Sequence, residues 1–576
     1  MVIKNFQMSI NKLNVLNLIK LDPDNNRLVD NIAEEIRKEY VNYLIKIGKA
    51  NEKNIDWWVL NFVSRNTLIS QLFRDICFLT MLKKRLKEGY LYDEIIIDSP
   101  ALKKAIKKNF YKYHFKINYK GRSVLHAYLG RINSYFKVFK QISSRFLAAW
   151  LTCKYKRIIK TDKALTLLDV FIFRNSFDKG IYLDRYYPKL FEYIDSNEKD
   201  YTYYVPTFYG LKKYKKIFNE MRKSKQNFLV KEDYLKLKDY LFALLYPLRL
   251  NKLKIEYRDF LGLDIYSLIR EEMANDRVSH SSIYSLLNYR FSRRLKVNGI
   301  KLRIIVNWFE NQIIDHGFNS GFRRYYPESK LIGYLGVPLL DNFLSLFPTE
   351  QERICAVIPE EINVIGNGYI NMVKEFCPDL QVKVAPALRY SEVWNKRNYF
   401  PDKHKCSILV ALPILIDESN EIMDIVLEAA CSINIKNCIF KIKPHPTCDI
   451  KKLSDKWSKK LPEMFKFANG DFNSCVEESD ILISSASTVC LETLVKGIPV
   501  IVIGNRLGLT QLSIPRSISK NIWKLCYSVN DVVEAIKLYA KKDNKKLNIY
   551  KKIGHEIRDN FFEPVTELGA RKFLCL

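Results

Sequence analysis

The stretch of residues 437–504 places the tightest limits on the fold of this 576-residue chain. It contains three short apolar runs, at residues 438–443, 480–483 and 500–504. Runs of this length with β-branched side chains are typical of buried strands. A helix is predicted at residues 489–496, between the second and third runs. This strand–loop–helix–strand order predicts an α/β fold with a parallel, doubly wound sheet.

The loops after the first two predicted strands carry polar groups. Pro444 and Pro446 fix φ and forbid helix, so Lys443 and His445 are expected on a rigid loop. The second loop, Ser-Ser-Ala-Ser-Thr at residues 484–488, precedes the predicted helix. Ligands of parallel sheets bind outside the carboxyl ends of the strands, and helix N-termini attract phosphate. Either loop alone is better explained as an ordinary turn or helix cap, but the pair favours a nucleotide site.

A Lys-x-His-Pro loop paired with a Ser-Ser/Thr loop resembles bacterial glycosyltransferases of the GT-B fold. The sequence is most similar to Kdo transferases of capsule synthesis and to sialyl- and polysialyltransferases, and more distantly to CDP-glycerol polymerases. The likeness covers roughly residues 405–505. A looser resemblance, to O-antigen and surface-carbohydrate synthesis proteins, extends to residues 307–336 and 64–66. In the first groups these motifs hold the CMP of the donor, which implies donor contacts from Lys443, His445, Ser484, Ser485, Ser487 and Thr488.

Glu492 lies about one turn into the predicted helix, where its carboxylate could accept hydrogen bonds from ribose hydroxyls. In glycosyl transfer, negative charge builds on the departing phosphate. Lys443, His445 and the helix N-terminus are expected to stabilise it. With these groups in place, no metal and no other cofactor is expected. The string Asp22-Pro23-Asp24 resembles a metal-binding Asp-x-Asp but is interpreted as a turn.

A second informative stretch, residues 302–336, predicts a strand at 302–306, a polar loop or helix start, and another strand at 330–335. Carboxylate, imidazole and guanidinium groups near a strand end suit an acidic-sugar acceptor. The predicted acceptor-side residues are Asn311, His316, Arg323 and Arg324, with Glu310 or Asp315 as the base of an inverting reaction. A retaining reaction needs no such base. Alternatively, Glu310 is a helix-start charge and Trp308 belongs to the core.

Residues 57–63 read as a further strand, followed by Ser-Arg-Asn-Thr and a helix at 68–87. In a two-domain transferase this loop would face the cleft, with Arg65 as an anion contact. A capped helix with a solvated arginine is equally consistent.

Residues 123–160 predict a long helix that mixes aromatic with basic side chains. Such a helix can lie on an anionic membrane, which would suit a lipid-linked acceptor. The alternative is a helix packed on the core with a solvated basic face. No run is long and apolar enough to span a bilayer.

The predicted organisation is two Rossmann-like domains facing a cleft, the GT-B arrangement. Residues 1–388 would form the acceptor-side domain and residues 389–576 the nucleotide-sugar domain. Residues 211–275 are predicted to be a helical insertion, with Leu237, Leu241, Leu244 and Leu245 on one helix face. The segment after Pro564 is expected to pack back across the cleft.

The net charge is +31, from 94 Lys and Arg against 63 Asp and Glu. This favours anionic partners. The basic residues are dispersed and no nucleic-acid-binding signature accompanies them, so nucleic acid is not expected as a partner. Twelve cysteines without a CxxC pair suit reduced thiols in a cytosol. A cytoplasmic location is therefore expected, with peripheral attachment to the inner face of the membrane as a further option.

The sequence thus predicts a glycosyltransferase that moves a sugar from a CMP-activated donor to a growing O-antigen or capsule glycan. The resemblance points to Kdo, sialic acid or another nonulosonic acid. Partners would be the nucleotide-sugar and a glycan or lipid-linked glycan acceptor. Three alternatives remain: a UDP-sugar transferase, a nucleotide-sugar 2-epimerase of the same fold, and a non-catalytic scaffold of polysaccharide assembly.

Overall fold

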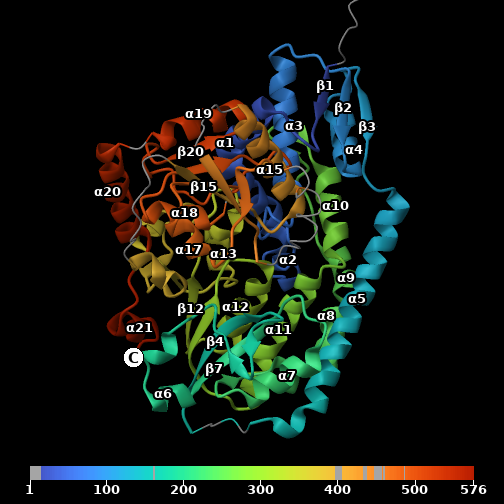
Figure 1. The fold of residues 1–576 in the computed structure, drawn as a ribbon. Helices are drawn as coiled ribbons and strands as arrows, with labels where there is room; N and C mark the ends of the chain where they lie inside the picture. Colours follow the sequence, from blue (N-terminus) through green and yellow to red (C-terminus); the bar gives the residue numbers. More distant parts are fainter. Residues whose placement is uncertain are drawn as a thin grey trace, which may run out of the picture.

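The computed structural model describes residues 14–157, 159, 162–395, 405–432, 438–446, 457, 461–485, 487–541 and 543–576. Two large parallel sheets dominate the molecule, one built from the middle of the chain and one from its last third (Figure 1). A smaller parallel sheet stands at one corner, and the long helix α5 (Val124–Leu151) runs down one side (Figure 1). The fold is therefore α/β, with two Rossmann-like domains.

The smaller sheet and its helices come from the beginning of the chain. The strands are β1 (Val15–Asn17), β2 (Glu94–Ile97) and β3 (Lys116–Tyr119), all parallel. The helices are α1 (Pro23–Gly48), α3 (Leu72–Lys87) and α4 (Pro100–Asn109). The sequence predicted α3 as a helix at 68–87 and assigned this whole region to the acceptor-side Rossmann domain. Its strands form a sheet of their own.

Asp22 starts helix α1. Its carboxylate accepts the backbone N–H of Asn25 at 2.9 Å, and Pro23 occupies the first turn, where it needs no N–H donor. The Asp-Pro-Asp string is therefore a helix cap. The same helix packs on the last domain: Asn26 Nδ2 donates to the carbonyl of Asn505 at 2.9 Å. Asp30 accepts the N–H of Thr510 at 2.9 Å.

The apolar run at residues 57–63 is not a strand. Helix α2 (Ile55–Trp58) covers its start, capped by the side chain of Asn54, and tight turns continue to Ser64. Trp57, Leu60 and Phe62 are buried, so the run is a core segment with helical rather than extended backbone. The pattern predicted burial correctly and backbone conformation wrongly.

The middle sheet has seven parallel strands. In spatial order they are β14 (Gln381–Val384), β13 (Glu361–Val364), β12 (Lys330–Leu335), β11 (Leu302–Trp308), β4 (Leu165–Ile172), β7 (Thr202–Phe208) and β8 (Asn227–Phe228). Chain order reverses between β4 and β11, which makes that pair the switch point of a doubly wound sheet. The central strands β11, β4 and β7 are buried on both faces, as such sheets require.

The helices around this sheet include α11 (His280–Val297) and α12 (Ile313–Tyr325), which lie in close contact. A Cβ added at Gly317 would stand 2.0 Å from the carbonyl oxygen of Ser285, so only glycine permits this approach. The other helices of this part are α6 (Ser196–Asp200), α7 (Tyr214–Lys223), α8 (Leu237–Leu244), α9 (Tyr246–Arg249), α10 (Tyr266–Asp276), α13 (Glu350–Ile354) and α14 (Ile370–Val373). Because α7 leads into strand β8 of the sheet, the predicted insertion at 211–275 is in part integral to the domain.

The last sheet has six parallel strands in the order β17 (Phe465–Phe467), β16 (Cys438–Lys443), β15 (Cys406–Ala411), β18 (Ile481–Ser484), β19 (Val500–Ile503) and β20 (Trp523–Cys526). Its helices are α15 (Ile416–Ser432), α17 (Phe472–Glu477), α18 (Val489–Val495) and α19 (Val529–Ala540). Numbered along the chain the order is 3-2-1-4-5-6, that of dinucleotide-binding sheets. The predicted strand–loop–helix–strand unit is confirmed.

The chain then returns to the middle sheet through α20 (Asn544–Phe561) and α21 (Glu567–Phe573). The ring of Phe573 packs 5.0 Å from that of Tyr334 on β12. The backbone N–H of Glu563 donates to Ile365 beyond β13 at 2.6 Å. As predicted, the final segment crosses from one domain to the other.

The remaining short strands are β5 (Phe177–Asp178), β6 (Ile181–Tyr182), β9 (Asp259–Phe260) and β10 (Leu263–Asp264). Within the described ranges no helix combines the length and apolar character needed to cross a membrane. The cysteines seen there are all free thiols.

Candidate functional site between the two sheets

The carboxyl edges of the two large sheets face one another. The loop after β12 meets the loop after β19, where the N–H of Asp341 donates to the carbonyl of Leu512 at 2.9 Å. Beside it, Asn342 Nδ2 donates to the carbonyl of Thr510 at 2.8 Å. Strand ends at which parallel sheets bind ligands are thus brought together from both domains.

The first predicted loop lies where expected, directly after β16. Lys443 ends the strand, and its ammonium donates to the carbonyl of Gly470. His445 follows, half-buried, and this burial lowers the pKa of its imidazole. His445 is therefore neutral near pH 7 and would meet a phosphate as a hydrogen-bond donor, while the positive charge would come from Lys443.

The second predicted loop follows β18, the strand across the switch point from β15. The Ser484 hydroxyl donates to the carbonyl of Ala411 at 2.9 Å, and its side chain is buried. It joins the two strands and uses its own proton to do so, so Ser484 could contact a nucleotide only by accepting a hydrogen bond. Ser485, Ser487 and Thr488 are half-buried and lie in front of α18. They remain predicted ligand residues.

A charged cluster fills the seam between the domains. It joins Glu310 after β11 and Glu492 on α18, with Arg389 and Tyr390 between them from the crossover. The Arg389 guanidinium lies 5.4 Å from the centre of the Trp308 ring, and the Trp308 indole donates to Glu310 Oε1 at 2.9 Å. Residues from both domains therefore meet around one arginine.

Two side chains of this cluster, Glu492 and Arg389, have pKa values shifted from the ordinary ones. Burial raises the pKa of Glu492 to about 7, although the neighbouring Arg389 opposes the rise. The side chain of Arg389 is exposed at the seam, and Tyr390, Tyr186, Glu310 and Glu492 together raise its pKa against desolvation, so it keeps its charge. A carboxyl group that titrates near neutral pH in a domain seam is a functional candidate. Sequence analysis singled out Glu492 and Glu310 but placed Arg389 and Tyr390 only at a domain boundary.

Asp315 is not placed to act as a base. It caps helix α12, where its carboxylate accepts the backbone N–H groups of Glu310 at 3.1 Å and Gln312 at 3.0 Å. The side chain is buried, which raises its pKa well above the usual value. Glu310 is half-buried at the switch point, so it alone of the two candidate bases stays a prediction.

Arg65, Asn311 and His316 are buried inside the first domain rather than facing an acceptor. Their common partner is the buried Glu352. Arg65 Nη2 binds its carboxylate at 2.9 and 2.8 Å, and Asn311 Nδ2 lies 3.3 Å from both oxygens. His316 Nδ1 contacts the carbonyl of Trp58 at 2.6 Å, and its Nε2 lies 3.3 Å from Glu352. These three residues hold a core network, which accounts for their position without an acceptor.

Arg323 and Arg324 also lie away from the strand ends. They sit in the last turn of α12, which starts at the carboxyl edge of β11 and rises about 1.5 Å per residue away from it. Arg323 pairs with Glu360 at 3.3 Å, and Arg324 donates to the Tyr289 hydroxyl at 3.1 Å. Their closeness to the strand end along the chain does not place them at the sheet edge, because the helix carries them away from it.

The seam also holds a small cavity of about 40 Å³, lined by residues of the crossover, α17 and α18. Its volume matches one or two ordered waters. Among the residues the structure describes, no cluster of three His, Cys, Asp or Glu side chains could hold a metal ion.

No protein-family model matches the chain, and no curated protein matches its sequence. Solved structures with a similar fold include S. aureus MnaA with UDP, at 10% identity and a TM-score of 0.41 over 72% of this chain and 95% of that one. UDP-GlcNAc 2-epimerase from Neisseria meningitidis bound to UDP-GlcNAc is 11% identical, with a TM-score of 0.40 over 71% of this chain and 98% of that one. The lipopolysaccharide outer core galactosyltransferase WaaB is 12% identical, with a TM-score of 0.40 over 72% of this chain and 100% of that one. The likeness is loose, and the fold described above stands on the chain's own sheets.

Proposed function

We propose that this chain is a nucleotide-sugar-dependent glycosyltransferase that extends a cell-surface polysaccharide. The observation that carries the proposal is the meeting of two sheet switch points around one charged seam. The last domain would hold the nucleotide-sugar and the middle domain the acceptor. The Lys-x-His-Pro and Ser-rich loops favour a CMP-activated donor, with Kdo, sialic acid or another nonulosonic acid as the sugar.

The donor's phosphate would lie against Lys443 and His445. Lys443 supplies a positive charge and His445 a neutral N–H donor, so both stabilise charge that develops on the departing phosphate. Ser485, Ser487 and Thr488 supply hydroxyl groups for phosphate and ribose.

Glu492 would accept from the ribose hydroxyls, and Arg389 beside it would attract the carboxylate of an acidic sugar. On the acceptor side, Glu310 is the candidate base. Its two oxygens accept from Trp308 at 2.9 Å and from Gln312 Nε2 at 2.7 Å, which fixes the carboxylate at the strand end. An inverting reaction would use it to deprotonate the acceptor hydroxyl.

A thermal-shift screen with CMP, CDP, UDP and GDP tests the proposal. A ligand that binds only the folded chain at about a hundred times its Kd stabilises it by about 2.7 kcal/mol. We expect CMP to raise the unfolding temperature of the wild-type chain and of His555→Ala, an exposed histidine on α20, but not of His445→Ala. Stabilisation by UDP alone would shift the donor class and favour the UDP-transferase or epimerase alternative. No response to any nucleotide would refute the proposal and favour a scaffold.

A further inference from the structure

Helix α5 presents a continuous apolar stripe to solvent. The exposed side chains recur at intervals of three, four and seven residues, so the helical period places them on one face. They are Leu125, Tyr128, Leu129, Ile132, Phe136, Phe139, Phe146, Leu147 and Trp150. Phe136 is 65% exposed and Trp150 64%, values that core aromatics do not reach. The outward surface of α5 therefore carries apolar side chains in addition to the solvated basic ones that the alternative predicts.

The opposite face anchors the helix to the body of the protein. Val138 and Ile142 are buried there, and Arg145 forms a buried ion pair with Glu232 at 2.8 Å. Farther along, the Tyr135 hydroxyl donates to the carbonyl of Leu244 at 2.7 Å. Contacts on the opposite face of α5 therefore keep the apolar stripe turned towards solvent.

Helices α8 and α9 continue the apolar surface beside α5. The ring of Phe146 on α5 lies 6.2 Å from that of Tyr240 on α8. Of the leucines predicted to share one helix face, Leu237 (75% exposed), Leu241 and Leu245 are exposed, and Leu244 is half-buried. Leu245 directly follows α8, and Leu248 on α9 is exposed as well. Scattered exposed leucines need no explanation, but a set gathered on adjoining helices marks an interaction surface.

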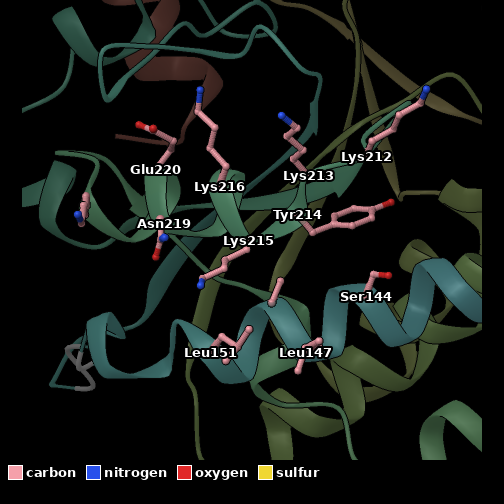
Figure 2. Close-up of a pocket in the computed structure, with 12 residues that line it drawn as sticks. Ser144, Leu147, Leu151, Lys212, Lys213, Tyr214, Lys215, Lys216, Asn219 and Glu220 are labelled. Carbon is pink, nitrogen blue, oxygen red and sulfur yellow. The ribbon is translucent and has the colours of Figure 1, made fainter.

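Basic side chains border this surface. A cavity of about 730 Å³ lies between α5 and α7, with Leu147 and Leu151 on its α5 side (Figure 2). Lysines from the α7 side line it, and Glu220 is the single carboxylate among its lining residues. These lysines are Lys212, Lys213, Lys215, Lys216 and Lys223. In Figure 2, Lys215 lies toward α5, while Lys213 and Lys216 extend away from it. No Asp or Glu occurs in the sequence between Asp98 and Asp162, so nothing on α5 itself neutralises them.

We propose that this face, formed by α5 and α7–α9, docks the protein on an anionic phospholipid bilayer. Exposed Phe, Trp and Leu side chains enter the boundary between headgroups and acyl chains, while the lysines bind lipid phosphates. An apolar stripe alone would suit many partners, but the lysine border selects a negatively charged one. A second copy of the chain is disfavoured because it would present the same positive face.

The test is co-sedimentation with vesicles of phosphatidylcholine alone and of phosphatidylcholine mixed with phosphatidylglycerol. We expect the chain to bind the mixed vesicles and to be released by salt. Phe136→Ser/Phe139→Ser/Trp150→Ser should weaken binding at least about a hundredfold, because three exposed apolar side chains no longer insert. The matched control Leu183→Ser/Ile354→Ser/Leu568→Ser replaces exposed apolar residues outside the surface and should bind like the wild type.

A second pair of variants tests the charge. Lys212→Gln/Lys215→Gln/Lys216→Gln should weaken binding to mixed vesicles about a hundredfold. Lys545→Gln/Lys551→Gln/Lys552→Gln on α20 removes the same charge elsewhere and should have little effect. Failure of the wild-type chain to bind mixed vesicles, or equal loss in both lysine variants, would overturn the proposal. The first result would leave an acidic protein as the occupant.

Discussion

The buried ion pair of Arg65 and Glu352 offers the sharpest test of how the first domain is held together. Burial alone would raise the pKa of Glu352, but Arg65, His316 and Thr349 outweigh it and lower the pKa from 4.5 to about 2. A fall in pKa of that size corresponds to a contribution of about 3 kcal/mol to the free energy of unfolding. Because the folded state lowers this pKa, the stabilisation is present above about pH 4.5 and is lost as the pH falls towards 2.

Arg65→Met leaves the carboxylate of Glu352 buried without its main partner. We expect the free energy of unfolding at pH 7 to fall by about 3–5 kcal/mol. The loss should shrink as the pH is lowered towards 4, because the variant's Glu352 then takes up a proton. Urea unfolding followed by far-UV circular dichroism at several pH values measures both effects.

Arg353→Met is the matched control, since Arg353 pairs with Glu350 at the surface one residue from Glu352. Its unfolding curve should stay close to that of the wild type. A loss below about 1 kcal/mol in Arg65→Met, the range of exposed pairs, would refute the reasoning. At a temperature where Arg65→Met is folded, its response to nucleotide should equal that of the wild type. A selective loss of that response would restore Arg65 as a ligand contact.

Three further predictions address packing and pH. Gly317→Ala should lower the free energy of unfolding by about 1–3 kcal/mol in thermal unfolding, because the added Cβ meets Ser285 on α11. Gly130→Ala on α5 should not lower it, because no atom lies within 4 Å of the added Cβ. Burial raises the pKa of Asp30 from 3.8 to about 6, so ionisation of this carboxyl lowers the free energy of unfolding by about 3 kcal/mol as the pH rises through that value. Asp30→Asn should therefore raise the unfolding temperature at pH 8 but not at pH 4. An equal change at both pH values would contradict this. Calorimetric nucleotide binding should strengthen as the pH rises through about 7, where Glu492 ionises, and Glu492→Gln should abolish that dependence.

Local sequence patterns predicted the last domain well. Strands β16, β18 and β19 are short β-branched runs, and each stands within one residue of its expected place, whereas β17 and β20 were not predicted. The run at residues 57–63 has a similar composition but follows Asn54, whose side chain caps a helical turn. Composition alone does not distinguish a buried strand from a buried turn, because both need apolar side chains.

Site residues could be predicted from the sequence only where they directly follow a strand. Lys443 and Glu310 each lie within two residues of a strand end, so knowing the strand places them. Arg389 lies in the crossover, and its position depends on how the two domains meet, which no local pattern records. Asp341 and Leu512 illustrate the same limit, since their contact joins loops from different domains.

The residues after β11 show why polar groups near a strand end divide into two kinds. Glu310 faces the seam, but Asn311 next to it has φ of +52°, a left-handed conformation that turns its side chain inward to Glu352. One turn into α12, His316 points the same way. Both residues contact Glu352, a buried carboxylate far along the chain that needs hydrogen-bond donors and also receives them from Arg65 and Thr349. A carboxylate buried in one segment thus determines which polar residues of another segment remain available for chemistry, and here it leaves Glu310.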